Sequence, residues 1–150
     1  MSMLKITDWK KLSLLSMLVL LPTLAVQPQI TAQSESLLTV KEVMTAVIAP
    51  TTATIWGAYE LESDAEWQEI ENAALTVIAA GNLLADGGAG PEDKGWAAEE
   101  DWQGYNNQMI TAAREVITAV GNQDEEALFN AGNDSLYPPC ESCHQQYQEQ

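Results

Sequence analysis

Apolar residues recur at three- and four-residue steps in four stretches of the chain, and this spacing predicts four amphipathic α-helices. We expect the first helix over residues 36–59, the second over 64–84, the third over 96–120 and the fourth from residue 123 onward. The apolar positions of the first stretch are Leu37, Val40, Met44, Val47, Ile48, Ile55, Trp56 and Tyr59. No competing stretch shows the alternation of apolar and polar residues that is typical of a strand.

Local signals predict where the first three helices begin, end or are disturbed. Ser63 followed by Glu66 predicts a capping box at the start of the second helix. Pro50 lacks a backbone N–H group, so we expect it to kink or break the first helix. The glycine-rich residues 85–95 predict a loop, and Gly121 is expected to close the third helix.

The fourth helix carries the most irregular sequence. Asn122 is a candidate cap for it, and residues 131–135 are expected to weaken it. Because proline is tolerated in the first turn of a helix, Pro138 and Pro139 are expected to restart a short final helix.

Four amphipathic helices with short links favour an all-α fold, an antiparallel four-helix bundle. This topology would bring the start of the first helix beside the end of the last. Trp56, Trp67 and Trp102 are expected in the core, since aromatic rings dominate buried area. The acidic residues 99–101, which open the third helix, are expected to be exposed to solvent.

The N-terminal residues 1–32 have the pattern of a secretory signal peptide. Lys5, Lys10 and Lys11 precede an apolar run over residues 12–26, and Ala32 offers a small residue for cleavage. The alternative is an uncleaved membrane anchor, although the run is short for a bilayer span. The mature domain would then comprise residues 33–150, in the periplasm.

The formal net charge of the chain is −16 at pH 7. Nucleic-acid binding depends on Lys and Arg contacts to phosphate, so this charge argues against nucleic acid as a partner. It also disfavours stable binding to an anionic membrane surface. It favours partners with basic surfaces.

Residues 140–144 hold both cysteines and the one histidine of the chain. Two cysteines three positions apart, followed at once by histidine, form the attachment pattern of c-type haem. In this pattern Cys140 and Cys143 would form thioethers with the haem vinyl groups. His144 would be the proximal iron ligand.

The two cysteines allow three other interpretations. A thioredoxin-like redox pair would need a strand before it and a helix after it, and that pattern is not visible here. A zinc site would need a fourth ligand, and the chain has no Cys or His outside this pentapeptide. A plain disulfide in an oxidising compartment is the alternative that stays open.

An exported helical bundle with Cys140, Cys143 and His144 on its last helix resembles the class II c-type cytochromes, the cytochrome c-prime family. Tyr147 also matches the family's C-terminal pattern, whereas Gln148 stands where the family often has a basic residue. The resemblance implies one haem c, covalently attached near the C-terminus of the last helix. It further implies either an electron carrier or a protein that binds NO or CO.

The choice between these two functions depends on the sixth iron ligand. In low-spin members of the family, a methionine of the first helix ligates the iron, and Met44 is the candidate here. Met109 is a weaker candidate, and either side chain could instead be a core residue. The sequence thus predicts a periplasmic electron carrier with His144 and Met44 as axial ligands, and no enzymatic activity. A five-coordinate, NO- or CO-binding protein is the alternative. The expected partners are redox proteins with basic surfaces, and a homodimer is left open.

Export is directly testable. Protein recovered from the periplasm should lack residues 1–32 and begin at Gln33, within a few residues. Intact-mass measurement of the purified protein checks this prediction. Full-length protein in the membrane fraction would mean that residues 12–26 act as an anchor instead.

Overall fold

The computed structural model describes residues 36–148. The signal peptide predicted over residues 1–32 lies outside the described residues. Within them all regular structure is helical, so the predicted all-α class is confirmed for this part of the chain. Along residues 36–148 no helix is both long enough and apolar enough to cross a membrane.

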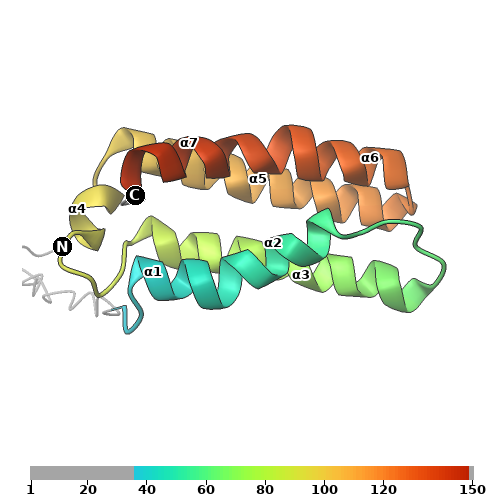
Figure 1. The fold of residues 1–150 in the computed structure, drawn as a ribbon, viewed down its shortest axis with the longest axis horizontal. Helices are drawn as coiled ribbons and strands as arrows, with labels where there is room; N and C mark the ends of the chain where they lie inside the picture. The colour runs from blue at the N-terminus through green and yellow to red at the C-terminus, as the bar shows by residue number, and fades with distance from the viewer. Residues whose placement is uncertain (1–35, 149–150) are drawn as a thin grey trace, which may run out of the picture. The chain divides into compact units, whose positions relative to one another are not determined.

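The helices of this region follow one another with short connections (Figure 1). Two segments, η1 and η2, are wound as π-helices, with a wider turn than the α-helix. The elements are α1 (Val40–Val43), η1 (Met44–Ile48), α2 (Ala49–Trp56), α3 (Asp64–Ala85), α4 (Asp93–Ala97), α5 (Glu100–Asn122), α6 (Glu125–Asn130), η2 (Ala131–Leu136) and α7 (Tyr137–Tyr147).

Several of these helices pack along one another around an apolar core. The longest, α3 and α5, lie side by side, while α2 packs on α3, and both η2 and α7 pack on α5 (Figure 1). The largest fully buried side chains are Leu84, Leu136, Val77 and Val116. Small residues such as Ala74 and Ala113 are also fully buried, which lets α3 and α5 approach closely.

The first helical run does not break at Pro50, contrary to the sequence prediction. Helix winding is continuous from Val40 to Trp56, and the segment just before the proline is a π-helix. There the Ala49 N–H donates to the Met44 carbonyl, five residues back. Pro50 has no backbone N–H to donate, and this wider turn accommodates the missing hydrogen bond.

The last helical run shows the same arrangement. Residues 131–135 were expected to weaken the helix, but they stay helical within η2, directly before Pro138 and Pro139 in the first turn of α7. The prolines therefore do not restart the helix, because the run continues from Glu125 to Tyr147.

Three predicted helix ends were also wrong. Trp96 belongs to the short helix α4, not to the third long helix, which begins at Glu100. Gly121 lies inside α5, which ends at Asn122 and is capped by Gln123 in the left-handed conformation (φ 50°). The cap of the next helix is Asp124, whose carboxylate accepts from the Ala127 N–H at 2.9 Å, and not Asn122.

The predicted capping box at α3 is confirmed. The Ser63 hydroxyl accepts from the Glu66 N–H, and the Glu66 carboxylate accepts from the Ser63 N–H at 2.8 Å. The helix then ends at Ala85, one residue beyond the expected end. The first helix is shorter than expected, since it begins at Val40, after the cap residue Thr39, and ends at Trp56.

Asp93 fixes the loop between α3 and α5. Its buried carboxylate accepts hydrogen bonds from the Val40 N–H and the Gly90 N–H, both at 2.8 Å. The Ala89 N–H also donates to the Leu38 carbonyl at 2.9 Å. These bonds hold the loop and α4 against the start of α1, where the candidate site lies.

Candidate functional site

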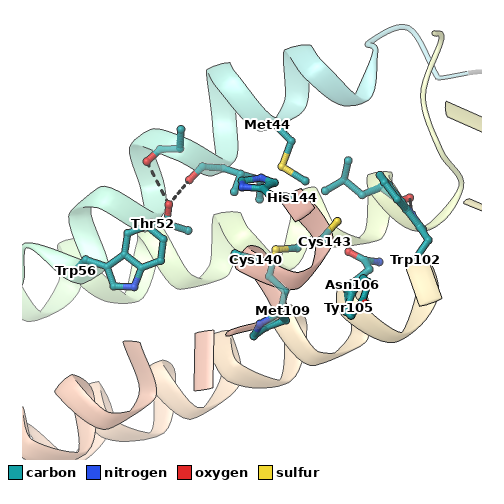
Figure 2. A pocket seen from close by; sticks show the side chains of 14 residues that line it. Met44, Thr52, Trp56, Trp102, Tyr105, Asn106, Met109, Cys140, Cys143 and His144 are labelled. Carbon is teal, nitrogen blue, oxygen red and sulfur yellow. Dashed lines mark hydrogen bonds between the residues drawn. The ribbon is translucent and has the colours of Figure 1, made fainter. Parts of the chain in front are cut away.

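The α7 helix presents Cys140, Cys143 and His144 to one cavity of about 200 Å³. Positions three and four residues apart lie on the same face of a helix, so the spacing in the sequence brings these three side chains together. Figure 2 shows the two sulfur atoms reaching into this space from α7.

Met44 reaches the same cavity from the other helical run, across from α7 (Figure 2). It lies in η1, and it is followed at four-residue steps by Ile48, Thr52 and Trp56, which all line the cavity. In a regular α-helix, with 3.6 residues per turn, side chains at four-residue steps drift around the axis. The wider π turn opposes that drift, so one face of the run stays directed at the cavity.

A second cavity, of about 320 Å³, adjoins the first on the side of α4. Both cavities are lined by Met44, Trp102, Cys143 and His144. The lining of the second cavity is more polar than that of the first, and it includes Lys41. The first is lined mainly by apolar side chains.

An aromatic cluster of Trp96, Trp102 and Tyr147 forms a wall of the second cavity. Trp96 and Trp102 stack with ring centroids 6.0 Å apart, and Tyr147 meets Trp102 edge-on at 5.1 Å. Trp102 is 2 % exposed, and its indole N–H donates to the Leu84 carbonyl at 2.9 Å. The cluster therefore links α4, α5 and α7 at the site.

Tyr147 is held at the edge of this cluster by an acid. Its hydroxyl donates to the Glu99 carboxylate at 2.8 Å. Desolvation of the phenol raises the pKa of Tyr147 to about 12, with further contributions from this hydrogen bond and from the negative charges of Glu99 and Asp101. The hydroxyl thus keeps its proton at neutral pH.

The two thiols are free and partly buried. Burial raises the pKa of Cys140 to about 11, and burial together with the neighbouring Cys140 raises the pKa of Cys143 to about 11. Catalytic redox cysteines have lowered pKa values, because the thiolate is the reactive form. The environment of this pair is therefore unlike that of a dithiol oxidoreductase.

Asn106 places a polar group in the wall of the first cavity. It is 7 % exposed, and its amide nitrogen donates to the Gly81 carbonyl at 2.9 Å. Its amide oxygen is the one buried side-chain polar atom without a hydrogen-bond partner in the described part of the chain.

Within residues 36–148 the structure places the side chains that were singled out for the core and the haem site. The four candidate haem residues all line the first cavity, and all but Cys140 also line the second. Met109, buried in α5, lines only the first cavity. Trp67 and Trp102 are buried as expected, but Trp56 is 40 % exposed, so its assignment to the core was wrong. Trp56 instead lines the cavity and donates to the Gly132 carbonyl at 2.9 Å. The acidic residues 99–101 are exposed, as predicted.

Two residues of the site were missed by sequence reasoning. Trp96 lies at the edge of a glycine-rich loop, where its position depends on the bonds made by Asp93. Asn106 interrupts the apolar stripe of α5, and a polar residue on a buried face is a signal that could have found it.

No group of three or more His, Cys, Asp or Glu side chains within residues 36–148 is arranged to hold a metal ion by itself. Comparison of the chain with family models, curated proteins and solved structures gives no match. The function is therefore argued from the site alone.

The Tyr147 environment gives a prediction about pH. The pKa of Tyr147 should be about 12 in the folded protein, against about 10 in the unfolded chain. The unfolded chain thus loses its proton first, so the stability contributed by this group is present below pH ~10 and falls as the pH rises towards ~12. An NMR titration of the Tyr147 ring measures the pKa. Glu99→Gln should lower it and Glu126→Gln, on α6, should not; an ordinary value in the unmodified protein would contradict the prediction.

Proposed function

We propose that this protein is a periplasmic, monohaem c-type cytochrome that carries electrons. Cys140 and Cys143 would attach the haem, while His144 and Met44 would be its axial ligands. One observation carries the proposal: Met44, from the first helical run, borders the same cavity as the Cys-x-x-Cys-His segment of the last. The sequence pattern alone predicts haem attachment and the proximal iron ligand. The position of Met44 at the same cavity adds a candidate ligand for the opposite face of the haem.

The two adjoining cavities fit the chemistry of a haem. The first is walled by apolar side chains such as Ile48, Leu84 and Pro139, which suit the faces and edges of a macrocycle. The second contains Lys41, whose ammonium group suits the carboxylates of the haem propionates. A haem held here would supply an iron that cycles between the ferric and ferrous states.

The residues of the chain would tune that iron through its axial ligands. A thioether from Met44 would favour the ferrous state and would raise the reduction potential relative to a second imidazole. Both ligands would come from helices that are packed on α3 and α5, so their positions would change little when the charge of the iron changes. Two protein ligands would also leave no open coordination position, which suits a carrier and not an enzyme.

The finer fold belongs to this proposal. The helical runs 40–56, 64–85, 100–122 and 125–147 would form an antiparallel four-helix bundle of the kind found in the class II c-type cytochromes. The packing of α2 on α3 and of η2 and α7 on α5 supports this arrangement.

Export and partner choice complete the proposal. Haem attachment through thioethers fits the periplasm, to which the predicted signal peptide would direct the chain. The exposed acids Glu99, Glu100 and Asp101 lie at the end of α5 nearest the aromatic cluster. They would favour a redox partner with a basic surface.

The second candidate function is binding of NO or CO by a five-coordinate haem. The apolar cavity beside Met44 favours it, because a displaced methionine side chain would leave space for a small diatomic ligand. The two functions differ in whether Met44 is bound to the iron.

Covalent attachment is the first test. Haem should remain with the polypeptide after denaturing, acidic extraction, because thioether bonds do not dissociate. Replacing both Cys140 and Cys143 by Ala should abolish this retention when cells with working haem maturation produce the protein. Intact mass and absorbance of the extracted polypeptide measure it.

Two outcomes would count against the attachment site. A double variant that keeps covalent haem would show that the thioethers form elsewhere. An unmodified protein with no haem band, made by the same cells, would favour the alternative of a plain disulfide between the two cysteines.

Met44→Ala separates the carrier from the gas-binding protein. Loss of the thioether should shift the ferric haem towards high spin and speed CO binding to the ferrous form. Met44 is half-buried, so its truncation would also lower stability without a change in coordination, and spin state is therefore the informative measurement.

Met109→Leu is the matched control, because it keeps the buried volume and removes the other methionine of the cavity. It should leave the optical spectrum unchanged. An unmodified protein that is already high-spin, or a Met44→Ala spectrum identical to that of the unmodified protein, would assign Met44 to the core and favour the gas-binding function.

A further inference from the structure

Three aromatic side chains of the first and last helical runs stay exposed at the surface. Phe129 of α6 is 65 % exposed, Tyr137 of α7 is 50 % exposed and Trp56 of α2 is 40 % exposed. Trp56 and Tyr137 meet edge-on, with ring centroids 6.1 Å apart. Aromatic rings contribute most when they are buried, so rings that gather at a surface indicate contact with another molecule.

Trp56 is held across the last helical run. Its indole N–H donates to the Gly132 carbonyl at 2.9 Å. A Cβ atom on Gly132 would lie 3.4 Å from the indole ring, so the ring lies directly over this position of η2. The hydrogen bond and this close contact fix the ring next to Tyr137.

Phe129 and Tyr137 share one face of the last run. Asn133, which is also exposed, stands midway between them, four residues from each. In a regular α-helix such a series would drift around the axis, but the wider turn of η2 opposes that drift. We call Trp56, Phe129 and Tyr137 the aromatic surface.

The aromatic surface is surrounded by negative charge. The last run, residues 125–147, contains four acids and no Lys or Arg. Each of its two exposed rings has two of these carboxylates within four residues, and residues at such spacing are neighbours on a helix. The acids, all exposed, are Glu125, Glu126, Asp134 and Glu141. On the side of the first run, residues 43–59 carry no charge at all.

We propose that the aromatic surface docks a partner protein that presents arginine side chains. A guanidinium group stacks on aromatic rings and pairs with carboxylates, and it is less strongly hydrated than the ammonium group of lysine. A second copy of this chain suits the surface poorly, because a two-fold contact joins identical patches and would set acids against acids. An anionic membrane surface would be repelled for the same reason.

Trp56 connects the aromatic surface with the first cavity, because its side chain also lines that cavity. A partner docked here would contact a residue that borders the space assigned to the haem. In this respect the inference rests on the proposed function, since it names where a redox partner with a basic surface would lie. Docking itself requires only the rings and the acids.

Two matched peptides test the proposal. One is a blocked peptide of three Ala-Ala-Arg-Ala-Ala repeats, and the other has lysine in place of each arginine, so the two carry equal charge. Each is titrated into the full mature protein by calorimetry, in about 150 mM salt, where long-range attraction to the acidic chain is screened. The arginine peptide should bind at least about threefold more tightly than the lysine peptide.

Variants of the exposed rings locate this preference. The double variant Phe129→Leu/Tyr137→Leu should remove it, whereas Tyr137→Phe, which keeps the ring, should retain it. Leu83→Ala is the control, because it truncates an apolar side chain of similar exposure on α3, and it should also retain the preference.

Each outcome decides the matter. Equal affinities for the two peptides, or a preference that survives the loss of both rings, would overturn the proposal. If the double variant does not fold, the NMR signal of the Trp56 indole N–H in the unmodified protein decides: it should shift with the arginine peptide, and an unmoved signal would contradict docking here.

Sedimentation of the protein alone tests the other occupant. A dimer that the double variant dissociates would assign the aromatic surface to a second copy and overturn the proposal. Haem retention is measured separately, so the two proposals fail separately. A protein that retains haem without the arginine preference would fail here alone, and one that shows the preference without haem would contradict only the proposed function.

Discussion

The missing N–H groups of three prolines are the constraint on which the rest of the site depends. Pro50 lies in the first helical run, and Pro138 and Pro139 lie in the last. In both runs a π-wound segment directly precedes the prolines, and the helix continues through them. A break at Pro50 would turn Met44 away from the cavity. A break at Pro138 and Pro139 would do the same to the Cys-x-x-Cys-His segment. Short π segments are frequent at functional sites, and here η1 keeps one face of the first run directed at the cavity, where a regular α-helix would turn that face away.

Sequence reasoning predicted the all-helical class of the fold and the approach of Met44 to the Cys-x-x-Cys-His segment better than the ends of the helices. Periodicity located all the long helices, and the spacing of Cys140, Cys143 and His144 sets their common face through backbone geometry alone. The errors at Pro50 and at residues 131–135 have one cause, since a local rule for α-helices does not foresee π winding. The left-handed end at Gln123 was missed because glycine is the usual residue in that conformation, and Gly121 stands two positions earlier.

The remaining surprises come from contacts between segments far apart in the sequence. Trp96 reaches the site because Asp93 holds its loop to the start of α1 through two backbone N–H groups. Trp56 is drawn out of the core by its hydrogen bond to Gly132, in the π segment of the last run. No pattern within one helix encodes either contact. The partly buried thiols, the apolar wall and the buried, unpartnered amide oxygen of Asn106 likewise emerge only when the helices are packed together.

The central claim is that Met44 and His144 hold one haem iron between two helical runs. NMR of the ferrous protein with labelled methionine methyl groups tests this claim most directly, because a methyl group held over a haem ring is shifted far upfield. The described residues contain two methionines, Met44 and Met109, so the assignment is simple. The account predicts one strongly upfield methyl signal, which disappears in Met44→Ala and persists in Met109→Leu. Two methyl signals at ordinary positions, or an upfield signal that belongs to Met109, would contradict it.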